Sequence, residues 1–262
     1  MSGSRTRYFV EYRDDVRIDT VAEGQGDLIV VLPSANRAST DMDDFATLLA
    51  GQGFRVLRPQ PRGMERTSAP LEGMTLRDLA DDVAAVIEHE GAGPAIVLGH
   101  AYGNWIARMV AAAHPGAVRG VVLAAASCLA PPNWVVDCFR ILVSPQATHD
   151  DRRDALRRAF FAPGHDPEIM VEGFHPALIG FYDAANRAIP KQVWWPAGSA
   201  PILDLQGALD PWRPADTRNE IRDALGDRVT IEVIAGLSHA LMLEEPEPVA
   251  QAIRQWADDL DA

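Results

Sequence analysis

The sequence predicts an α/β domain whose mostly parallel sheet is covered by helices on both faces, and three observations lead to this prediction. Apolar runs typical of buried strands alternate with segments of helical periodicity along most of the chain. Most of these runs are continuous, as expected for parallel strands buried on both faces. The chain has 262 residues, 47% of them hydrophobic, which is enough for one large core.

Eight strands are predicted. The first two, near 8–12 and 16–21, alternate between apolar and polar residues and resemble an antiparallel edge hairpin. The other six are apolar runs at 28–32, 55–57, 95–98, 121–124, 202–205 and 229–234. Together they predict an eight-stranded, mostly parallel sheet with helices on both sides.

Helical patterns lie between the strands. Residues 75–78 form a variant of the capping box, and apolar residues on one helical face follow it, namely Leu79, Val83, Val86 and Ile87. The last helix has a comparable stripe, formed by Val249, Ala250, Ile253, Trp256 and Leu260. Both helices are therefore expected to pack one face against the sheet.

Residues 131–196 interrupt the strand–helix alternation. They are rich in aromatic residues and show helical patterns without a convincing strand. We expect a helical lid over the carboxyl ends of the strands, where α/β folds bind ligands, with residues 1–130 and 197–262 forming the core. A peripheral helical decoration is the alternative.

Charge and composition exclude several classes of function. The net charge of −13 and pI near 4.9 argue against binding nucleic acid. Lys191 is the single lysine, which argues against Schiff-base chemistry and a phosphate-binding P-loop. There is no long apolar run that would span a membrane, and the N-terminal stretch lacks the apolar core of a secretory signal. We therefore expect a cytoplasmic protein with Cys128 and Cys138 as free thiols.

Three motifs occur in a fixed order along the chain. Gly99-His100-Ala101-Tyr102-Gly103 joins a strand to a helix, Gly207-Ala208-Leu209-Asp210-Pro211 follows a strand, and Gly236-Leu237-Ser238-His239 follows the last strand. In this order they resemble the nucleophile elbow, acid and histidine of the α/β-hydrolase superfamily. The resemblance covers essentially the whole chain and implies the α/β-hydrolase fold.

The resemblance implies that His239 is a general base and that Asp210 orients it and stabilises its charged form. A structural histidine and an ordinary turn aspartate are the alternatives. Asp204, within the strand, and Asp137, after the preceding strand, are the other candidates for the acid.

The loop after the strand at 28–32 usually begins His-Gly in this superfamily, but here it reads Leu32-Pro33-Ser34-Ala35-Asn36-Arg37. We expect the backbone amide of Ala35 or Ser34 to form the oxyanion hole with that of Tyr102. Arg37 is either a clamp for a carboxylate or a solvated loop charge. Ser34 could substitute for the nucleophile only if its loop presented the hydroxyl to the histidine.

Ala101 occupies the position of the nucleophile, so covalent serine chemistry is impossible for this sequence. It is either a replaced serine or a natural alanine. Several stretches resemble a bacterial subgroup of the superfamily with alanine there: Leu32-Pro33-Ser34, Gly99-His100-Ala101, Phe160-Phe161-Ala162-Pro163-Gly164 and Trp194-Trp195. Plant methylketone synthases, which decarboxylate β-keto acids on the same fold, also have alanine at the elbow. The resemblance therefore favours a natural alanine.

We expect an enzyme without cofactor or metal that acts on a small carbonyl compound, such as an ester, a lactone, a β-keto acid or a C–C bond. An oriented histidine and an oxyanion hole suit reactions through an enolate or oxyanion. The expected substrate is apolar or aromatic, and its pocket is expected to include His100, Cys128, Trp134 and Trp194. The alternatives are a serine hydrolase inactivated at position 101 and a non-catalytic binding homologue. The expected partner is the small molecule alone, with no nucleic acid or membrane, and a homodimer is possible.

Overall fold

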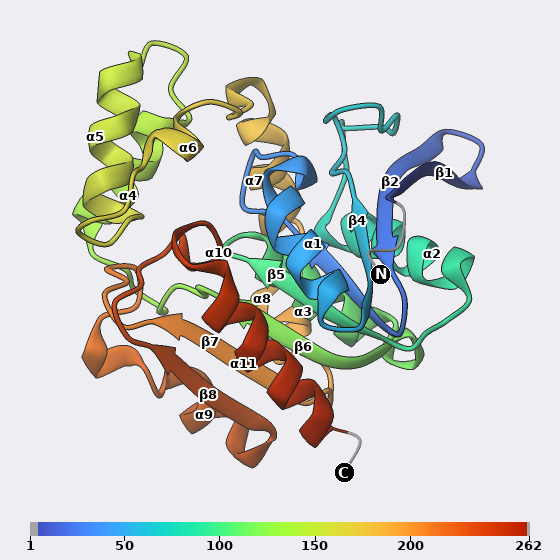
Figure 1. The fold of residues 1–262 in the computed structure, drawn as a ribbon. Helices are drawn as coiled ribbons and strands as arrows, with labels where there is room; N and C mark the ends of the chain where they lie inside the picture. Colours follow the sequence, from blue (N-terminus) through green and yellow to red (C-terminus); the bar gives the residue numbers. More distant parts are fainter. Residues whose placement is uncertain (1–4, 261–262) are drawn as a thin grey trace.

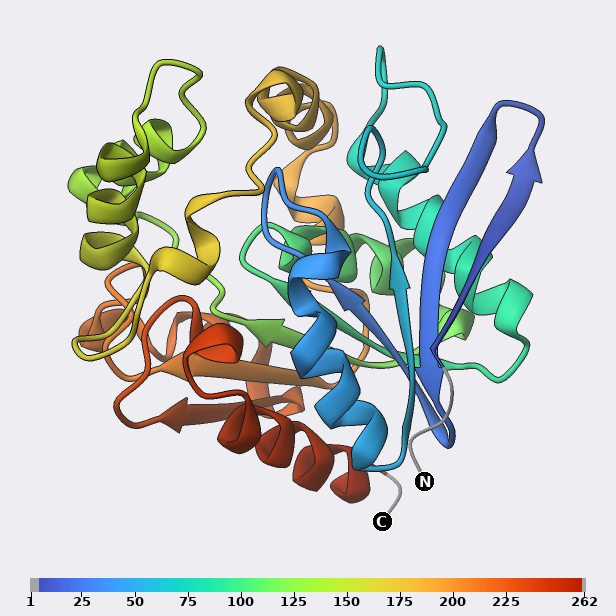
Figure 2. The same cartoon turned by 45° about the horizontal axis from the view of Figure 1, so that its top comes forward.

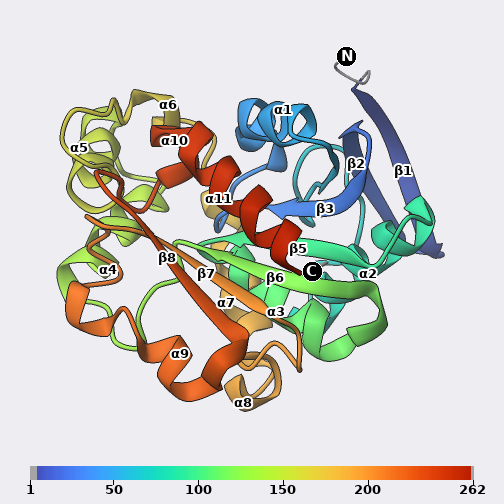
Figure 3. The same cartoon turned by 60° about the horizontal axis from the view of Figure 1, so that its bottom comes forward.

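The computed structural model describes residues 5–260, so the first four residues of the N-terminal stretch discussed above, and the last two of the chain, lie outside the described residues. Its eight-stranded sheet has the order β1-β2-β4-β3-β5-β6-β7-β8. The strands are β1 (Thr6–Arg13), β2 (Val16–Gly24), β3 (Asp27–Leu32), β4 (Phe54–Pro59), β5 (Ala95–His100), β6 (Val118–Ala124), β7 (Ile202–Gly207) and β8 (Val229–Ile234). Figure 3 shows how the strands twist across the molecule from β1 to β8.

The predicted sheet is confirmed, including its pattern of strand directions. β2 pairs antiparallel with β1 and β4, and the pairs from β4 through β8 are parallel. Only β1 of the expected hairpin lies at the edge, because β2 also pairs with β4. All of β2 except Arg17 is buried accordingly.

Helices cover both faces of the sheet. α1 (Asp43–Gly51), α10 (Leu241–Glu244) and α11 (Pro246–Asp259) contribute to the core on one face, and α1 and α11 lie at the front in Figure 2. The core on the other face contains residues of α2 (Leu76–Glu90) and α3 (Gly103–Ala113). α9 (Glu220–Leu225) follows β7. Short 3-10 helices occur at Ser39–Met42, Pro115–Ala117, Pro176–Leu178, Ala215–Thr217 and Gly226–Arg228.

The predicted start of α2 is confirmed. Thr75 is the N-cap, its hydroxyl accepts a hydrogen bond from the amide of Asp78, and the Asp78 carboxylate accepts one from the amide of Thr75. This capping box satisfies two amides that the first helical turn leaves unpaired.

The segment between β6 and β7 consists of helices: α4 (Asn133–Leu142), α5 (His149–Ala159), α6 (Glu168–Val171), α7 (Ile179–Arg187) and α8 (Lys191–Trp194). α4, α5 and α6 share a separate apolar cluster, and Figure 1 shows them grouped at the upper left. Tyr182 of α7 and Trp194 of α8 instead belong to the main core. The segment therefore packs as two groups, while the division of the chain into core and lid stays a prediction.

None of the helices within residues 5–260 is both long and apolar enough to cross a membrane.

Candidate active site

The turn between β5 and α3 holds Ala101 in a backbone conformation that few side chains adopt. Its φ is +47°, in the left-handed region. The amide of Ala101 donates to the carbonyl oxygen of Ala124 at 3.0 Å, and its carbonyl oxygen accepts from the backbone and side-chain amides of Asn104. These bonds to β6 and α3 hold the strained turn in place.

The glycines on either side of Ala101 allow the backbone to pack closely. A Cβ atom at Gly99 would lie 2.2 Å from the carbonyl carbon and oxygen of Gly103. A Cβ atom at Gly103 would lie 2.6 Å from the carbonyl oxygen of Pro33. Because these neighbours are backbone atoms, a side chain at either glycine would force the turn to move. The sharp turn therefore requires both glycines.

His239 and Asp210 form a buried pair in the loops after β8 and β7. The two atoms His239 Nδ1 and Asp210 Oδ2 are 2.9 Å apart, and the other carboxylate oxygen accepts from the amide of Trp212 at 2.8 Å. Because a carboxylate accepts, Nδ1 carries the proton in this bond and Nε2 is left free to accept one. The pair thus has the arrangement of an oriented general base.

Two aromatic rings fix the plane of the His239 ring. The Trp212 ring stacks on it with centroids 5.2 Å apart, and the Phe160 ring meets it edge-on at 5.0 Å. Phe160 follows α5, so the segment between β6 and β7 contributes directly to the position of the histidine.

The two other candidate acids have different partners. Asp204 is fully buried, and its carboxylate accepts from Arg213 Nη2 at 3.0 Å and from Gln206 Nε2 at 2.9 Å. Burial raises the pKa of Asp204 to about 6, although the nearby Arg213 charge acts in the opposite direction. Asp137 is exposed on α4 and pairs with Arg140. Asp210 is thus the carboxylate bonded to His239.

The side chain of His100 bonds to the backbone of the loop that carries His239. Its Nε2 lies 2.8 Å from the carbonyl oxygen of His239, so Nε2 donates. Burial lowers the pKa of His100 to about 3, with a further contribution from the charge of His239. His100 is therefore neutral near pH 7 and positions the backbone of His239.

A cavity of about 160 Å³ lies beside His239 and Ala101. Its wall also includes Ser34, Ala35, Tyr102, Trp105, Ala125, Ser127, Phe139, Phe160, Ile179, Tyr182, Asp183 and Trp212. The residues predicted for the oxyanion hole, Ser34, Ala35 and Tyr102, thus face the same space as the histidine. Within residues 5–260, none of the backbone amides of Ser34, Ala35 and Tyr102 donates a hydrogen bond to a protein acceptor.

Five residues expected to contact the substrate do not line this cavity, namely Arg37, His100, Cys128, Trp134 and Trp194. Arg37 is buried, and its guanidinium forms an ion pair with Asp41. The guanidinium also donates a hydrogen bond to the carbonyl oxygen of Met170 at 3.0 Å, and its central carbon lies 4.5 Å from the centroid of the Phe174 ring. It therefore ties the loop after β3 to α6 and is neither a solvated charge nor directed at the cavity.

The other four differ in how deeply they are buried. Cys128 is buried behind Ser127, with its amide bonded to the carbonyl oxygen of Trp212 at 2.9 Å. Trp134 is 42% exposed on α4. Trp194 is buried, and its ring packs against that of the wall residue Trp105, with the ring centroids 5.7 Å apart. His100, also expected in the pocket, lies beneath the loop of His239.

Several wall residues were not expected from the sequence. Trp212 is two residues after Asp210, so its position beside the acid was a usable signal. Trp105 occupies the first turn of α3, and Tyr182 and Asp183 lie on α7. Only the packing of α7 over the sheet places those last two side chains at the site.

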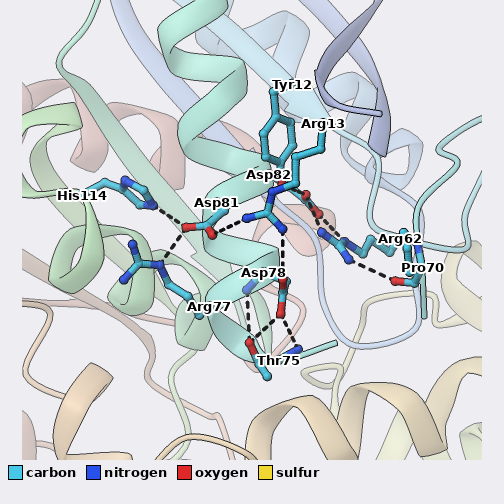
Figure 4. A network of polar contacts seen from close by, with 10 residues as sticks. All are labelled: Tyr12, Arg13, Arg62, Pro70, Thr75, Arg77, Asp78, Asp81, Asp82 and His114. Atoms are coloured by element: carbon cyan, nitrogen blue, oxygen red, sulfur yellow. Dashed lines mark hydrogen bonds and ion pairs between the residues drawn. The ribbon is translucent and has the colours of Figure 1, made fainter. Parts of the chain in front are cut away.

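Tyr182 connects α7 to a polar network on the core. Its hydroxyl donates to the carbonyl oxygen of Arg62 at 2.8 Å, and its own carbonyl oxygen accepts from the Tyr102 hydroxyl at 3.2 Å. The Arg62 guanidinium binds both carboxylate oxygens of Asp82, which also accepts from Tyr12 (Figure 4). This buried network holds the α7 wall of the cavity against α2.

Within the described residues, no group of three or more histidine, cysteine, aspartate or glutamate side chains is arranged to hold a metal ion.

Comparisons with known proteins identify the family of the chain. A sequence model described as the alpha/beta hydrolase family matches residues 29–252. The match spans most of the chain, and the chain therefore belongs to the alpha/beta hydrolase family. The fold expected from the motifs is confirmed.

Two curated relatives are enzymes. A non-heme chloroperoxidase of Streptomyces lividans is 34% identical over 240 residues, covering 80% of this chain and 84% of that protein. Epoxide hydrolase B of Mycobacterium tuberculosis is 32% identical over 106 residues, covering 40% of this chain and 30% of that protein. Among solved structures, a membrane phospholipase A described as a bacterial virulence factor aligns with a TM-score of 0.80 at 20% identity. That alignment covers 98% of this chain and 87% of the other, and it supports the fold alone.

Proposed function

We propose that this protein is an enzyme that acts on a small carbonyl compound through the His239–Asp210 pair and an oxyanion hole, without a serine nucleophile. The observation that carries the proposal is the position of His239, which is bonded to Asp210 and shares one cavity with the methyl group of Ala101. A protein that only binds a ligand has no need for an oriented base.

Hydrolysis by water is the reaction that best fits these groups. His239 Nε2 takes a proton from water, and the resulting hydroxide attacks the carbonyl carbon of the substrate. The amides of Ala35 and Tyr102 bind the oxyanion of the tetrahedral intermediate. When the intermediate collapses, the imidazolium returns the proton to the leaving oxygen, so no bond to the protein forms.

The magnitude of catalysis is expected to be modest. Loss of the nucleophile from a working triad costs about a million-fold in turnover. A positioned base contributes roughly 10²–10⁴-fold, and each oxyanion donor roughly 10²–10³-fold. Reactive substrates are therefore expected, and the same groups would also stabilise the enolate in decarboxylation of a β-keto acid or in C–C cleavage.

A panel of aryl esters, lactones and β-keto acids, with products followed by mass spectrometry, tests the proposal. His239→Ala and Asp210→Asn are each expected to lower turnover at least 100-fold, because the base is lost or no longer oriented. His149→Ala is the matched control, since His149 is 46% exposed on α5 and does not line the cavity.

Intact-protein mass spectrometry during turnover is expected to show no acyl adduct. Binding without turnover across the panel would contradict the proposal and indicate a binding homologue. Turnover that survives His239→Ala would likewise contradict it.

A further inference from the structure

The charged residues that line the cavity are distributed unevenly between acidic and basic types. Asp183 of α7 lines the cavity, and no lysine or arginine does so among the described residues. The rest of the wall consists of apolar and neutral polar residues and the imidazole of His239. A ligand in this cavity therefore lies beside one acidic residue, and no lysine or arginine within residues 5–260 lines the wall around it.

Two buried guanidinium groups, on the loop after β3 and on α3, are bonded to other partners. Arg37 is bonded to Asp41 and to the carbonyl oxygen of Met170. Arg108 of α3 donates to Asn104 Oδ1 at 3.1 Å and to the carbonyl oxygen of Trp195. Neither is available to neutralise an anionic ligand.

Aromatic rings dominate the rest of the wall. They belong to Tyr102, Trp105, Phe139, Phe160, Tyr182 and Trp212. The face of such a ring attracts a cation, with tryptophan the strongest. The Tyr102 ring packs against Trp105 at 5.0 Å and Tyr182 at 5.7 Å, so these three form one continuous surface next to Asp183.

We propose that the cavity selects its carbonyl substrates by charge, preferring compounds with a protonated amine or quaternary ammonium group, accepting neutral ones and rejecting carboxylates, with Asp183 as the specificity-determining residue. This inference rests on the proposed function and narrows it, because it places anionic β-keto acids last among the candidate substrates. The net charge of −13 acts in the same direction by attracting cations to the protein.

Arg187 moderates the effect of Asp183. Its Nη1 lies 3.7 Å from Asp183 Oδ2, one turn along α7, and the two side chains are 72% and 58% exposed. An exposed pair of this kind is weak, so Asp183 keeps most of its attraction for a ligand cation. Removing Asp183 is therefore expected to lower the preference for cationic ligands, and removing Arg187 is expected to raise it.

Binding of three aromatic probes, benzylammonium, benzyl alcohol and benzoate, tests the proposal without requiring turnover. Binding is measured through tryptophan fluorescence, because two tryptophan residues, Trp105 and Trp212, line the cavity. In the unmodified protein at low salt, benzylammonium is expected to bind about 5- to 30-fold tighter than benzyl alcohol, and benzoate weakest. Asp183→Asn is expected to reduce the ratio of cation to neutral affinity about 2- to 5-fold, and Arg187→Gln to increase it.

Asp154→Asn is the matched control, because Asp154 forms a comparable exposed pair with Arg157 on α5 outside the cavity wall. Its ratios are expected to equal those of the unmodified protein, and 1 M salt is expected to remove the contribution of Asp183. Equal ratios in the unmodified protein and Asp183→Asn, or tightest binding of benzoate, would overturn the proposal. Turnover of neutral esters without this order of affinities would refute the charge selection alone, whereas the order without turnover would refute the proposed function.

Discussion

Ala101 places only a methyl group at the turn between β5 and α3, where the nucleophile elbow motif has its central residue. The backbone there keeps φ at +47°, although no hydroxyl has to be presented to His239. A left-handed residue costs roughly 1–2 kcal/mol, so the hydrogen bonds from Ala101 and Asn104 must offset that strain. The methyl group shares one cavity with His239.

Ala101→Ser tests what this position does. If alanine belongs to the native chemistry, the variant is expected to gain less than tenfold in ester hydrolysis, because the rest of the site works without a nucleophile. The measurement is kcat/KM on aryl esters together with intact mass during turnover. A rise of several orders of magnitude with an acyl adduct would instead identify an inactivated serine hydrolase.

A buried ion pair between Arg213 and Asp204 joins β7 to the loop that follows it. Arg213 donates to Asp204 on β7, to the carbonyl oxygen of Arg218 at 3.0 Å and to that of Ala126 at 3.4 Å. The amide of Arg213 also bonds to the carbonyl oxygen of Asp210 at 3.1 Å. The pair therefore fastens the loop that carries Asp210 to the sheet.

Asp204→Asn is expected to lower the free energy of unfolding by about 3–5 kcal/mol, because the Arg213 guanidinium is left buried without a counter-charge. Urea unfolding measures this loss. Turnover of the folded fraction is expected to fall less than tenfold, in contrast to Asp210→Asn. If Asp204→Asn instead abolished turnover without loss of stability, Asp204 would have to act in the chemistry itself.

The stability of the molecule as a whole depends on a neutral His100. Its pKa falls from the ordinary value of 6.5 to about 3 on folding, chiefly because of burial. The unfolded chain thus binds more protons between these values, and the contribution of His100 to stability is complete above pH 6.5 and is lost as the pH falls below it.

We expect the unfolding free energy of the unmodified protein to fall more steeply with acid than that of His100→Gln. The difference is expected to reach up to about 1.4 kcal/mol per pH unit between pH 6 and 4, the slope for one proton. Glutamine can still donate to the carbonyl oxygen of His239, so the variant is expected to fold. Urea unfolding at several pH values measures both slopes, and parallel slopes would show that His100 does not titrate with unfolding.

Periodicity and motif order were enough to predict the eight strands and the mostly parallel sheet, but not the position of β2 inside it. Strands β3 to β7 are almost entirely buried and therefore appear in the sequence as apolar runs, whereas the edge strand β8 exposes Thr230 and Glu232. The capping box at Thr75 is a local signal. The loop residues His239 and Asp210 follow strands whose ends meet at one edge, so their approach could also be expected.

The remaining wall of the cavity depends on long-range packing that no local pattern encodes. Trp134 and Trp194 are both aromatic residues of the same segment, yet one is exposed on α4 and the other is buried behind Trp105. Arg37 looks like a free charge in the sequence, but its partners come from 4 and 133 residues away. Asp183 has the pattern of an ordinary surface carboxylate, and only the docking of α7 places it at the cavity wall.

The end of α5 is joined to the loop of His239 by main-chain contact as well as by the Phe160 ring. The amide of Ala240 donates to the carbonyl oxygen of Phe160 at 2.8 Å, and the Trp212 indole donates to the carbonyl oxygen of Ala159 at 2.9 Å. Any movement that admits a ligand must therefore either carry the imidazole along with α5 or occur elsewhere in the rim. Entry of a ligand past α7 would leave the ring of His239 in place, so its orientation would be set before the ligand binds.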